Sequence, residues 1–300
     1  MTKLTTLSDA IRTHVHHGDL VYASGFTHLI PFAAGHEIIR QGIKELTLAR
    51  ATPDLIYDQM VAAGCARKLI FSYMGNPGVG SLRVLRSAIE SGQLDWEEYS
   101  HFGMISRLRA GASGLPFMPM NPTGAEDLAA HNPNYQQVKD PYTGKSVVVV
   151  PPLTPDVAII HVQRADIQGN AQVWGILGEQ QLAAFASQRV ILTVEEVVDQ
   201  AVIRSDPNRT IIPGMVVSAV CHVPFCAHPS YTQGYHDRDN ELYLAWDEIS
   251  KTGESVQAYL DEWVYGVPDR KTYWEKLGPD VHRRLSAGER LSQPVNYGDY

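Results

Sequence analysis

Strand-like apolar runs and helical segments alternate regularly over the first 90 residues, and this alternation constrains the fold most strongly. Runs with strand character occupy residues 20–24, 45–50 and 68–73, and a segment with helical periodicity follows each one. Proline and glycine punctuate these segments, as Pro31 and Gly42 do around one expected helix. Strands that alternate with helices pair in parallel and need cover on both sides. The sequence predicts an α/β fold with an open, mostly parallel sheet and helices on both faces.

The later part of the chain continues this pattern less regularly. Residues 113–145 are rich in Pro, Gly and Asn, which predicts a long irregular excursion. Further strands are expected at residues 146–151, 156–162, 189–195 and 215–223, and helices near 177–187 and 246–263. From about residue 278 the chain is polar and basic without a core stripe. We expect one domain over residues 1–277 and a polar C-terminal tail over residues 278–300.

Composition narrows the class of protein. The chain has 300 residues, 44% of them hydrophobic, with a formal net charge of −8. This is enough apolar material for a large core, and the negative charge argues against a nucleic-acid-binding face. No apolar run approaches the ~20 residues of a membrane helix, and the N-terminus lacks the features of a secretory signal. Three cysteines are too few for a disulfide framework. We expect a soluble, cytoplasmic protein.

The stretch SYMGNPGVGS, residues 72–81, joins an expected strand to an expected helix. Free N–H groups and the helix dipole favour an anion at such a turn, and ligands gather at the carboxyl ends of parallel strands. The glycine spacing fits neither a Walker A loop nor the dinucleotide-binding fingerprint. A tight turn that needs positive φ at Gly78 or Gly80 explains the same residues, so this stretch alone leaves both interpretations open.

A second stretch, YASGFTHLIP at residues 22–31, also runs from a strand through a glycine into a helix. Two such turns after neighbouring strands would line one crevice, and their main chains could bind a polar ligand. The alternative is a simple strand end at residues 24–26, with Phe26 plugging the core.

Several other polar residues invite a metal or catalytic interpretation. They are His14, His16, His17, Glu195, Glu196, Cys221, His222, Cys226 and His228. The first histidines lie where a helix ends, a position that favours imidazolium without any metal. The Cys and His residues do not have a standard zinc spacing, and neighbouring strand residues such as the two glutamates face opposite ways. We expect no metal site from them.

Six segments in order resemble the alpha subunits of family I CoA-transferases. They are GDLVYASGFTHLIP, EIIRQGIKELTLA, GCARKLIFSYMGNPGVGSLRVLRSA, AGASGLPFMP, PDVAIIHVQRADIQGNAQVWG and AHPSYTQGYHDRDN. The resemblance runs from about residue 4 to residue 277. It is closest to the branch that acts on 3-oxoadipate in aromatic degradation, and the glutaconate branch is similar but less close.

The resemblance implies a CoA-transferase-type sheet and a partner, a beta subunit of similar fold, in an α2β2 or larger hetero-oligomer. The family's nucleophile is a glutamate in a Ser-Glu-Asn-Gly-like motif of the beta subunit. This chain lacks that motif, and Glu179 and Glu254 do not match it. The resemblance therefore implies that the chain holds no catalytic residue of its own, is inactive alone, and has a CoA thioester as substrate with no permanently bound cofactor.

The implied chemistry passes CoA from an acyl-CoA, with succinyl-CoA as the expected donor, through a glutamyl-CoA intermediate to a short dicarboxylic or 3-oxo acid. Such a site must stabilise oxyanions and orient two acids, which main-chain N–H groups can do. We assign this role to Ser24, Gly25, Phe26, Thr27, Asn76, Pro77, Gly78, Val79, Gly80 and Ser81. A distal carboxylate needs a cation, and the candidates are Arg50, Arg107, Arg109 and Arg164, with Arg50 first because it follows a strand.

Two alternatives stay open. A hydrolase branch of the same fold opens steroid-derived rings as CoA thioesters, and its alpha subunits carry an acid just before a Gly-Met-Leu segment. The matching stretch here, residues 100–105, reads SHFGMI and has no acid. The other alternative is a non-catalytic acyl-CoA-binding protein that has kept the fold.

Overall fold

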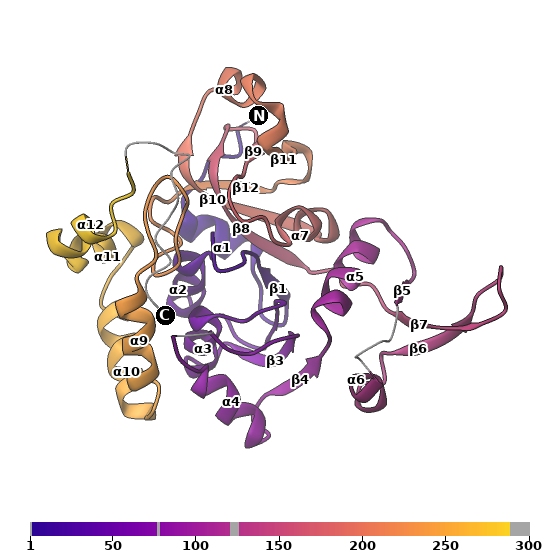
Figure 1. Ribbon diagram of the computed structural model, residues 1–300. Helices are drawn as coiled ribbons and strands as arrows, with labels where there is room; N and C mark the ends of the chain where they lie inside the picture. Colours follow the sequence, from indigo (N-terminus) through magenta and orange to yellow (C-terminus); the bar gives the residue numbers. More distant parts are fainter. Residues whose placement is uncertain (1, 77–78, 121–125, 289–300) are drawn as a thin grey trace.

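A run of parallel strands forms the centre of the computed structural model, which describes residues 2–76, 79–120 and 126–288 (Figure 1). The strands lie in the order β12–β10–β8–β1–β2–β3–β4. Their bounds are β1 Leu20–Ala23, β2 Leu46–Ala49, β3 Ala66–Phe71, β4 Asp95–Glu98, β8 Val157–Ala165, β10 Arg189–Val197 and β12 Ala219–His222. Two short strands, β9 (Ala171–Gln172) and β11 (Thr210–Ile212), add antiparallel pairs beside the end of β8. The predicted open, mostly parallel sheet is confirmed.

Helices cover both faces of this sheet. One face carries α1 (Leu7–His14), α2 (Phe32–Arg40), α3 (Leu55–Ala62), α4 (Arg83–Glu90), α9 (Asn240–Ile249) and α10 (Gly253–Leu260), and the other carries α5 (His101–Ala112) and α7 (Gln180–Ala186). Strand residues alternate between the two cores: Val21 packs on the first side and Tyr22 on the second. Because both faces are buried at the centre of the sheet, β1 (LVYA) and β2 (LTLA) have nearly continuous apolar sequences, whereas β4 (DWEE) at the edge does not.

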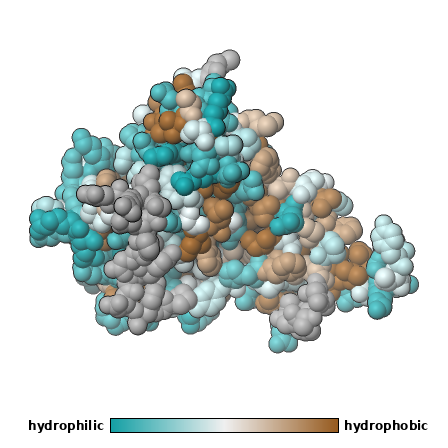
Figure 2. All heavy atoms as spheres, turned by 45° about the horizontal axis from the view of Figure 1, so that its top comes forward, coloured by the Kyte–Doolittle hydropathy of each residue, from teal (hydrophilic) through white to brown (hydrophobic). Residues whose placement is uncertain are grey.

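Strands at residues 118–120, 136–139 and 146–150 form a separate arm, which corrects the prediction of an irregular excursion over residues 113–145. The strand expected at residues 146–151 exists as β7 (Ser146–Val150), but it joins no strand of the main sheet. It pairs antiparallel with β5 (Met118–Met120) and β6 (Gln136–Lys139), and α6 (Glu126–His131) lies between those two strands in sequence. A tight turn after Asp140 brings β6 and β7 together, so the nearest strand in sequence becomes the partner. The arm projects from the body (Figure 1), and its tip is hydrophilic (Figure 2).

The C-terminal part is more ordered than the sequence predicts. The single helix expected near 246–263 is two helices, because Ser250 ends α9 and the Thr252 hydroxyl caps the start of α10. The remaining helical segments are α8 (Gln200–Ser205), 3-10 turns at Pro207–Arg209 and Gly214–Val216, a π-helical turn at Asp261–Tyr265, α11 (Arg270–Leu277) and α12 (Pro279–Arg284). The predicted tail therefore begins with a helix, and Leu285 behind it is buried. No helix in the described ranges has the length and apolarity to cross a membrane.

Candidate active site

Loops that follow four neighbouring strands meet at the carboxyl edge of the sheet and enclose a cavity of about 430 Å3. Phe26 and Thr27 follow β1, Arg50, Thr52 and Asp54 follow β2, Tyr73, Gly75 and Asn76 follow β3, and His101 begins the helix after β4. Arg238, from far along the chain, completes the lining. Open α/β sheets bind their ligands at this edge, so this cavity is the candidate active site.

The turn after β1 has a constrained main chain. Gly25 has φ of +120°, and a Cβ placed there would lie 2.6 Å from the carbonyl oxygen of Leu29. Thr27 and Leu29 also have positive φ values of 53° and 59°, which non-glycine residues rarely adopt. The Ser230 hydroxyl donates to the Thr27 carbonyl at 2.7 Å and so ties the turn to a distant segment. This turn places Phe26 and Thr27 at the cavity as predicted, while Ser24 is buried behind them.

Arg50 is the more deeply buried of the two arginines that line the cavity: 1% of its surface is exposed, against 8% for Arg238. Its Nη2 donates to the Gly25 carbonyl at 2.5 Å, whereas Nε and Nη1 find no acceptor among the described residues. Burial raises the pKa of Glu179, and the charge of Arg50 opposes that rise. A buried guanidinium with two unused donor groups is strongly suited to bind a carboxylate.

Two of the other candidate arginines are engaged elsewhere. Arg107 donates to Glu97 and to the Pro151 carbonyl. Arg164 donates to Glu196 at 2.8 Å. Neither of these arginines, nor Arg109, lines the cavity. Arg50 is thus the predicted arginine that the structure brings to the site.

The turn after β3 is closed on itself, unlike the predicted main-chain cradle. The Asn76 N–H donates to the Gly80 carbonyl at 3.3 Å, and the Val79 N–H donates to the Asn76 carbonyl at 3.1 Å. The Ser81 N–H donates to Asp247 Oδ1 at 3.1 Å. These three N–H groups are therefore used within the chain, and Pro77 and Gly78 lie outside the described residues. A Cβ at Gly80 (φ +113°) would lie 2.8 Å from the Cβ of Asp247, so glycine is needed for this packing.

From the turn after β3, Gly75 and Asn76 line the cavity. Asn76 is 8% exposed, and its Nδ2 has no acceptor among the described residues. Val79 is instead buried in the core, and Ser81 lies in a different groove, beside α4 and α10.

Several cavity residues were not assigned a role from the sequence, among them Thr52, His101 and Arg238. His101 Nε2 lies 2.9 Å from Thr52 Oγ1, and His101 Nδ1 lies 2.8 Å from Ser72 Oγ. Burial lowers the pKa of His101. The Arg238 guanidinium stacks over the Tyr243 ring at 4.2 Å. These residues come together only through the fold, since no short motif joins the segments they belong to.

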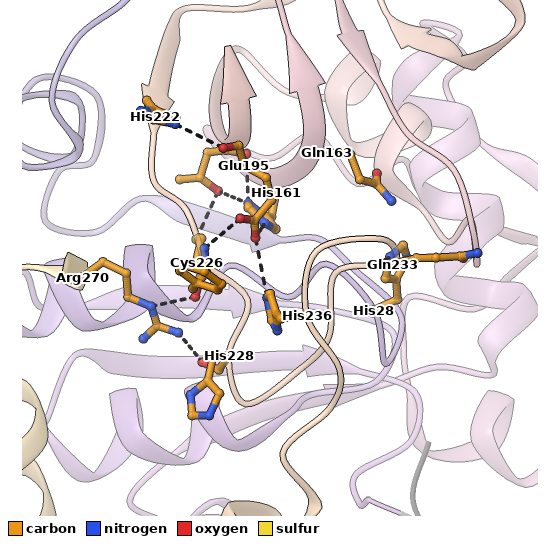
Figure 3. Close-up of polar contacts among 12 residues, drawn as sticks. His28, His161, Gln163, Glu195, His222, Cys226, His228, Gln233, His236 and Arg270 are labelled. Carbon is orange, nitrogen blue, oxygen red and sulfur yellow. Dashed lines mark hydrogen bonds and ion pairs between the residues drawn. The ribbon is translucent and has the colours of Figure 1, made fainter. Parts of the chain in front are cut away.

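A buried charged cluster lies under residues 223–239, the segment that carries Arg238 (Figure 3). Glu195 lies between two histidines in this view, and its Oε1 is 3.0 Å from His161 Nε2 and 3.5 Å from His236 Nε2. Its Oε2 accepts from the Phe225 N–H at 2.8 Å. Burial alone would raise the pKa of Glu195, but the hydrogen bonds and charges of the two histidines hold it well below its usual range. Burial also opposes the charged form of His161, but Cys226 and Glu195 reverse this and raise its pKa to about 10.

A second buried pair holds the other end of the same segment. His228 Nε2 lies 3.0 Å from Asp239 Oδ2, and Arg270 donates to the carbonyls of Phe225 and His228 at 2.8 and 2.5 Å. Arg284 adds an ion pair with Asp239 at 3.0 Å. Together these contacts fix the segment that positions Ser230 and Arg238 against the cavity. Within the described ranges, no group of three or more His, Cys, Asp or Glu side chains is arranged to hold a metal ion.

The two glutamates face opposite ways, as the sequence predicts. Glu195 is buried, whereas Glu196 on the same strand faces the other way and bonds Arg164 and the Tyr235 hydroxyl. The cysteines, at positions 65, 221 and 226, are free and buried.

Comparisons with known proteins agree on the family. The model of the family described as Coenzyme A transferase matches residues 4–222. The A subunit of the 3-oxoadipate CoA-transferase of Pseudomonas knackmussii is 49% identical over 280 residues, covering 92% of this chain and 99% of that protein. The A subunit of the glutaconate CoA-transferase of Acidaminococcus fermentans is 36% identical, covering 93% of this chain and 92% of that protein. A crystal structure of glutaconate CoA-transferase from that organism matches with a TM-score of 0.90 at 34% identity and covers 96% of each chain.

A more distant relative marks the neighbouring branch. The IpdA subunit of the cholesterol ring-cleaving hydrolase of Mycobacterium tuberculosis is 25% identical, covering 88% of this chain and 94% of that protein. A crystal structure of the decarboxylase AibA/AibB matches with a TM-score of 0.74 at 31% identity and covers 87% of this chain. The 49% and 36% identical relatives above, and the structure with the TM-score of 0.90, are transferases. This chain therefore belongs to the coenzyme A transferase family of enzymes, among its A, or alpha, subunits.

Proposed function

We propose that this chain is the acid-binding half of a CoA-transferase that moves CoA from an acyl-CoA such as succinyl-CoA to a short dicarboxylic or 3-oxo acid such as 3-oxoadipate. The observation that carries the proposal is Arg50, a buried cation at the cavity whose Nε and Nη1 have no acceptor among the described residues. A guanidinium binds a carboxylate through two parallel hydrogen bonds. The unreactive carboxylate of a diacid is the group we assign to it.

The attacking group comes from a companion beta subunit. The carboxylate that lines the described cavity, Asp54, caps α3 through the Leu55 N–H at 2.7 Å and accepts from the Tyr243 hydroxyl at 3.0 Å. A carboxylate held in this way is a structural cap rather than a nucleophile. The reacting glutamate is then, as the family resemblance implies, one of the companion beta subunit.

The transfer proceeds through two thioester exchanges. The companion's glutamate attacks the acyl-CoA thioester, which breaks the carbon–sulfur bond and gives a mixed anhydride and CoA thiolate. The thiolate attacks the glutamyl carbonyl, releases the first acid as its carboxylate, and forms a glutamyl-CoA thioester. The incoming acid reverses both steps and leaves as its CoA ester. The acid is already ionised at neutral pH, so it needs orientation rather than a general base.

The companion binds over the mouth of the cavity. Large apolar side chains stay exposed there: Phe26 at 37%, Tyr73 at 48%, and Phe102, which follows His101, at 60%. Exposed apolar groups rimming a polar cavity are typical of a protein interface. Figure 2 shows apolar side chains gathered near the middle of one face of the molecule.

The test is to co-express this chain with a beta subunit of the family and to supply succinyl-CoA with a panel of acids. We expect CoA to move to 3-oxoadipate, glutaconate or another short diacid, and borohydride to trap the companion's glutamate by reducing its CoA thioester. The chain purified alone should transfer nothing. Full-rate transfer by this chain alone would refute the proposed division of roles.

The panel also separates the alternatives. Ring-opening hydrolysis of a CoA thioester without transfer would place the chain in the hydrolase branch, and ligand binding without any turnover by the complex would indicate a binding protein. An Arg50→Gln variant should lose diacids selectively. Arg86→Gln is the matched control, since Arg86 is an exposed arginine on α4, outside the cavity.

A further inference from the structure

His101 connects two hydroxyl groups at the edge of the cavity. Its Nδ1 is 2.8 Å from Ser72 Oγ, and its Nε2 is 2.9 Å from Thr52 Oγ1. Ser72 Oγ is also 2.6 Å from the Ala51 carbonyl oxygen. Thr52 and His101 both line the cavity, whereas Ser72 stands behind the ring.

These distances fix the positions of the hydrogens. Two oxygens 2.6 Å apart need a hydrogen between them, and a carbonyl has none, so the Ser72 hydroxyl donates to Ala51. Ser72 Oγ must then accept from His101 Nδ1. In the neutral ring the other nitrogen, Nε2, has no hydrogen, so the Thr52 hydroxyl donates to it.

The chemical consequence concerns what Thr52 offers to a ligand. With the ring neutral, the only hydrogen of the Thr52 hydroxyl is used on His101, and lone pairs remain for the cavity. These lone pairs repel a carboxylate. With the ring protonated, Nε2 donates to Thr52, and the Thr52 hydroxyl hydrogen becomes free for the ligand.

We propose that Thr52 and His101 form a proton-linked donor for the acid substrate, so that binding of a carboxylate beside Thr52 takes up one proton on His101. His101 is in this sense a positioning residue, and Thr52 contacts the substrate. The inference rests on the proposed function, because it needs a carboxylate in this cavity.

The surroundings of the ring fit this role. Phe26 meets it edge-on, with ring centroids 6.4 Å apart, and contributes no charge. The charged groups that share the cavity are Arg50, Asp54 and Arg238. Burial is the cause that lowers the pKa of His101, so the ring is neutral near pH 7 in the empty chain. A bound anion attracts the protonated ring and so raises the pKa of His101.

The first measurement is the pH dependence of kcat/KM for glutarate in the complex with the beta subunit, from about pH 6 to about pH 8.5. In the unmodified enzyme, we expect kcat/KM to fall about tenfold per pH unit above the pKa of His101. Thr52→Val should remove this slope and raise KM roughly tenfold at the acid end, the effect of losing one hydrogen bond to a charged group. Thr52→Ser keeps the hydroxyl and should keep the slope.

His101→Gln gives a different signature. The Gln amide nitrogen donates to Thr52 at every pH, so KM should stay low and lose its pH dependence. If these residues had only a role in folding, the two variants would not both lose the pH dependence of KM, with a high KM in Thr52→Val and a low KM in His101→Gln. If His101→Gln does not fold, the Val and Ser pair at position 52 still decides the matter.

The second measurement does not need turnover. Calorimetric titration of the complex with glutarate, in two buffers of different ionisation heat, counts the protons taken up. We expect about one proton in the unmodified enzyme and in Thr52→Ser, and about none in Thr52→Val and His101→Gln. Glutarate binding without proton uptake, no glutarate binding, or an unchanged pH slope in both Thr52→Val and His101→Gln would overturn the inference. Proton-linked binding in a complex that transfers no CoA would overturn the proposed function and leave this inference standing.

Discussion

The molecule holds two buried polar groups with opposite designs. At the cavity, Arg50 and Asn76 keep donors that the described chain does not use. Under residues 223–239, Glu195 has both oxygens engaged, by His161 and by the Phe225 N–H. A buried donor without an acceptor lowers the stability of the folded state, and such donors are found where a ligand supplies the missing acceptor. The donors of Arg50 and Asn76 are therefore arranged to bind a ligand. The cluster around Glu195 instead holds residues 223–239 in place beside the cavity.

The strongest test of this contrast is Glu195→Gln. Removing one charge of a buried pair leaves the His161 imidazolium without its counter-ion, and such changes destabilise proteins by roughly 3–5 kcal/mol. Urea denaturation of the chain measures this loss. The matched control is Glu196→Gln on the same strand, where the partly exposed bond to Arg164 should contribute less than about 1 kcal/mol. Equal losses in the two variants would contradict the holding role of Glu195.

The cavity side of the contrast is tested by Arg50→Gln. The variant should lose roughly hundredfold in kcat/KM for dicarboxylates, about 3 kcal/mol, because a buried charged hydrogen-bond pair is broken. Monocarboxylates should lose much less, since they offer Arg50 nothing. Steady-state kinetics of the complex with glutarate and butyrate give the ratio. A similar loss for both acids would show that Arg50 holds the loop rather than the substrate.

The buried cluster of Glu195 and His161 also predicts how the stability of the chain depends on pH. The pKa of Glu195 is lowered from 4.5, so its contribution is present above about pH 4.5 and is lost as the pH falls further. The pKa of His161 is raised from 6.5 to about 10, so its contribution is complete below about pH 6.5 and declines as the pH rises toward 10. The difference in unfolding free energy between the unmodified chain and Glu195→Gln should peak between these limits. On the alkaline side it should fall by at most about 1.4 kcal/mol per pH unit. A difference that grew from pH 7 to pH 9 would contradict this assignment.

The smallest effect is expected from Asp247→Asn, which tests the closed turn after β3. Asp247 accepts from the Ser81 N–H and pairs with Arg83 at 3.0 Å, both near the surface. We expect a loss of about 1 kcal/mol or less in stability and unchanged kinetics with every acid. Thermal unfolding and the diacid panel measure both. A changed KM for any of the acids would show that residues 79–81 take part in substrate binding.

The sequence predicts the sheet well because its signal is local. The first three strands each carry an apolar run that a glycine or proline follows, so these strands and the site at their carboxyl edge could be predicted. The fourth, β4, has the sequence DWEE and no apolar run, so it was not predicted. The closed turn after β3 could not be predicted, because Asp247, which accepts from the Ser81 N–H, lies 166 positions away. The arm was not predicted for a similar reason: the apolar run of β7 indicates that a strand exists but not which strand it pairs with.

Individual site residues divide in the same way. Arg50 was identified because it directly follows a strand, and its position in the sheet fixes its place. His101 and Arg238 were not, because their roles depend on Thr52, Ser72 and Tyr243, which come near only in the folded chain. Their residue types alone give no sign of these contacts.

Arg238 reaches the cavity from beyond residue 222, where the family match ends. Its segment is held from outside by Glu195, which pairs with His236, and by Arg270 and Arg284, which bind the Phe225 and His228 carbonyls and Asp239. Anyone grafting substrate preference between relatives must therefore move residues 223–239 together with those anchors. If only the loops after β1, β2 and β3 were exchanged, the cavity would combine these loops from one protein with residues 223–239 of the other. Such a cavity would bind the acid substrate of neither protein well.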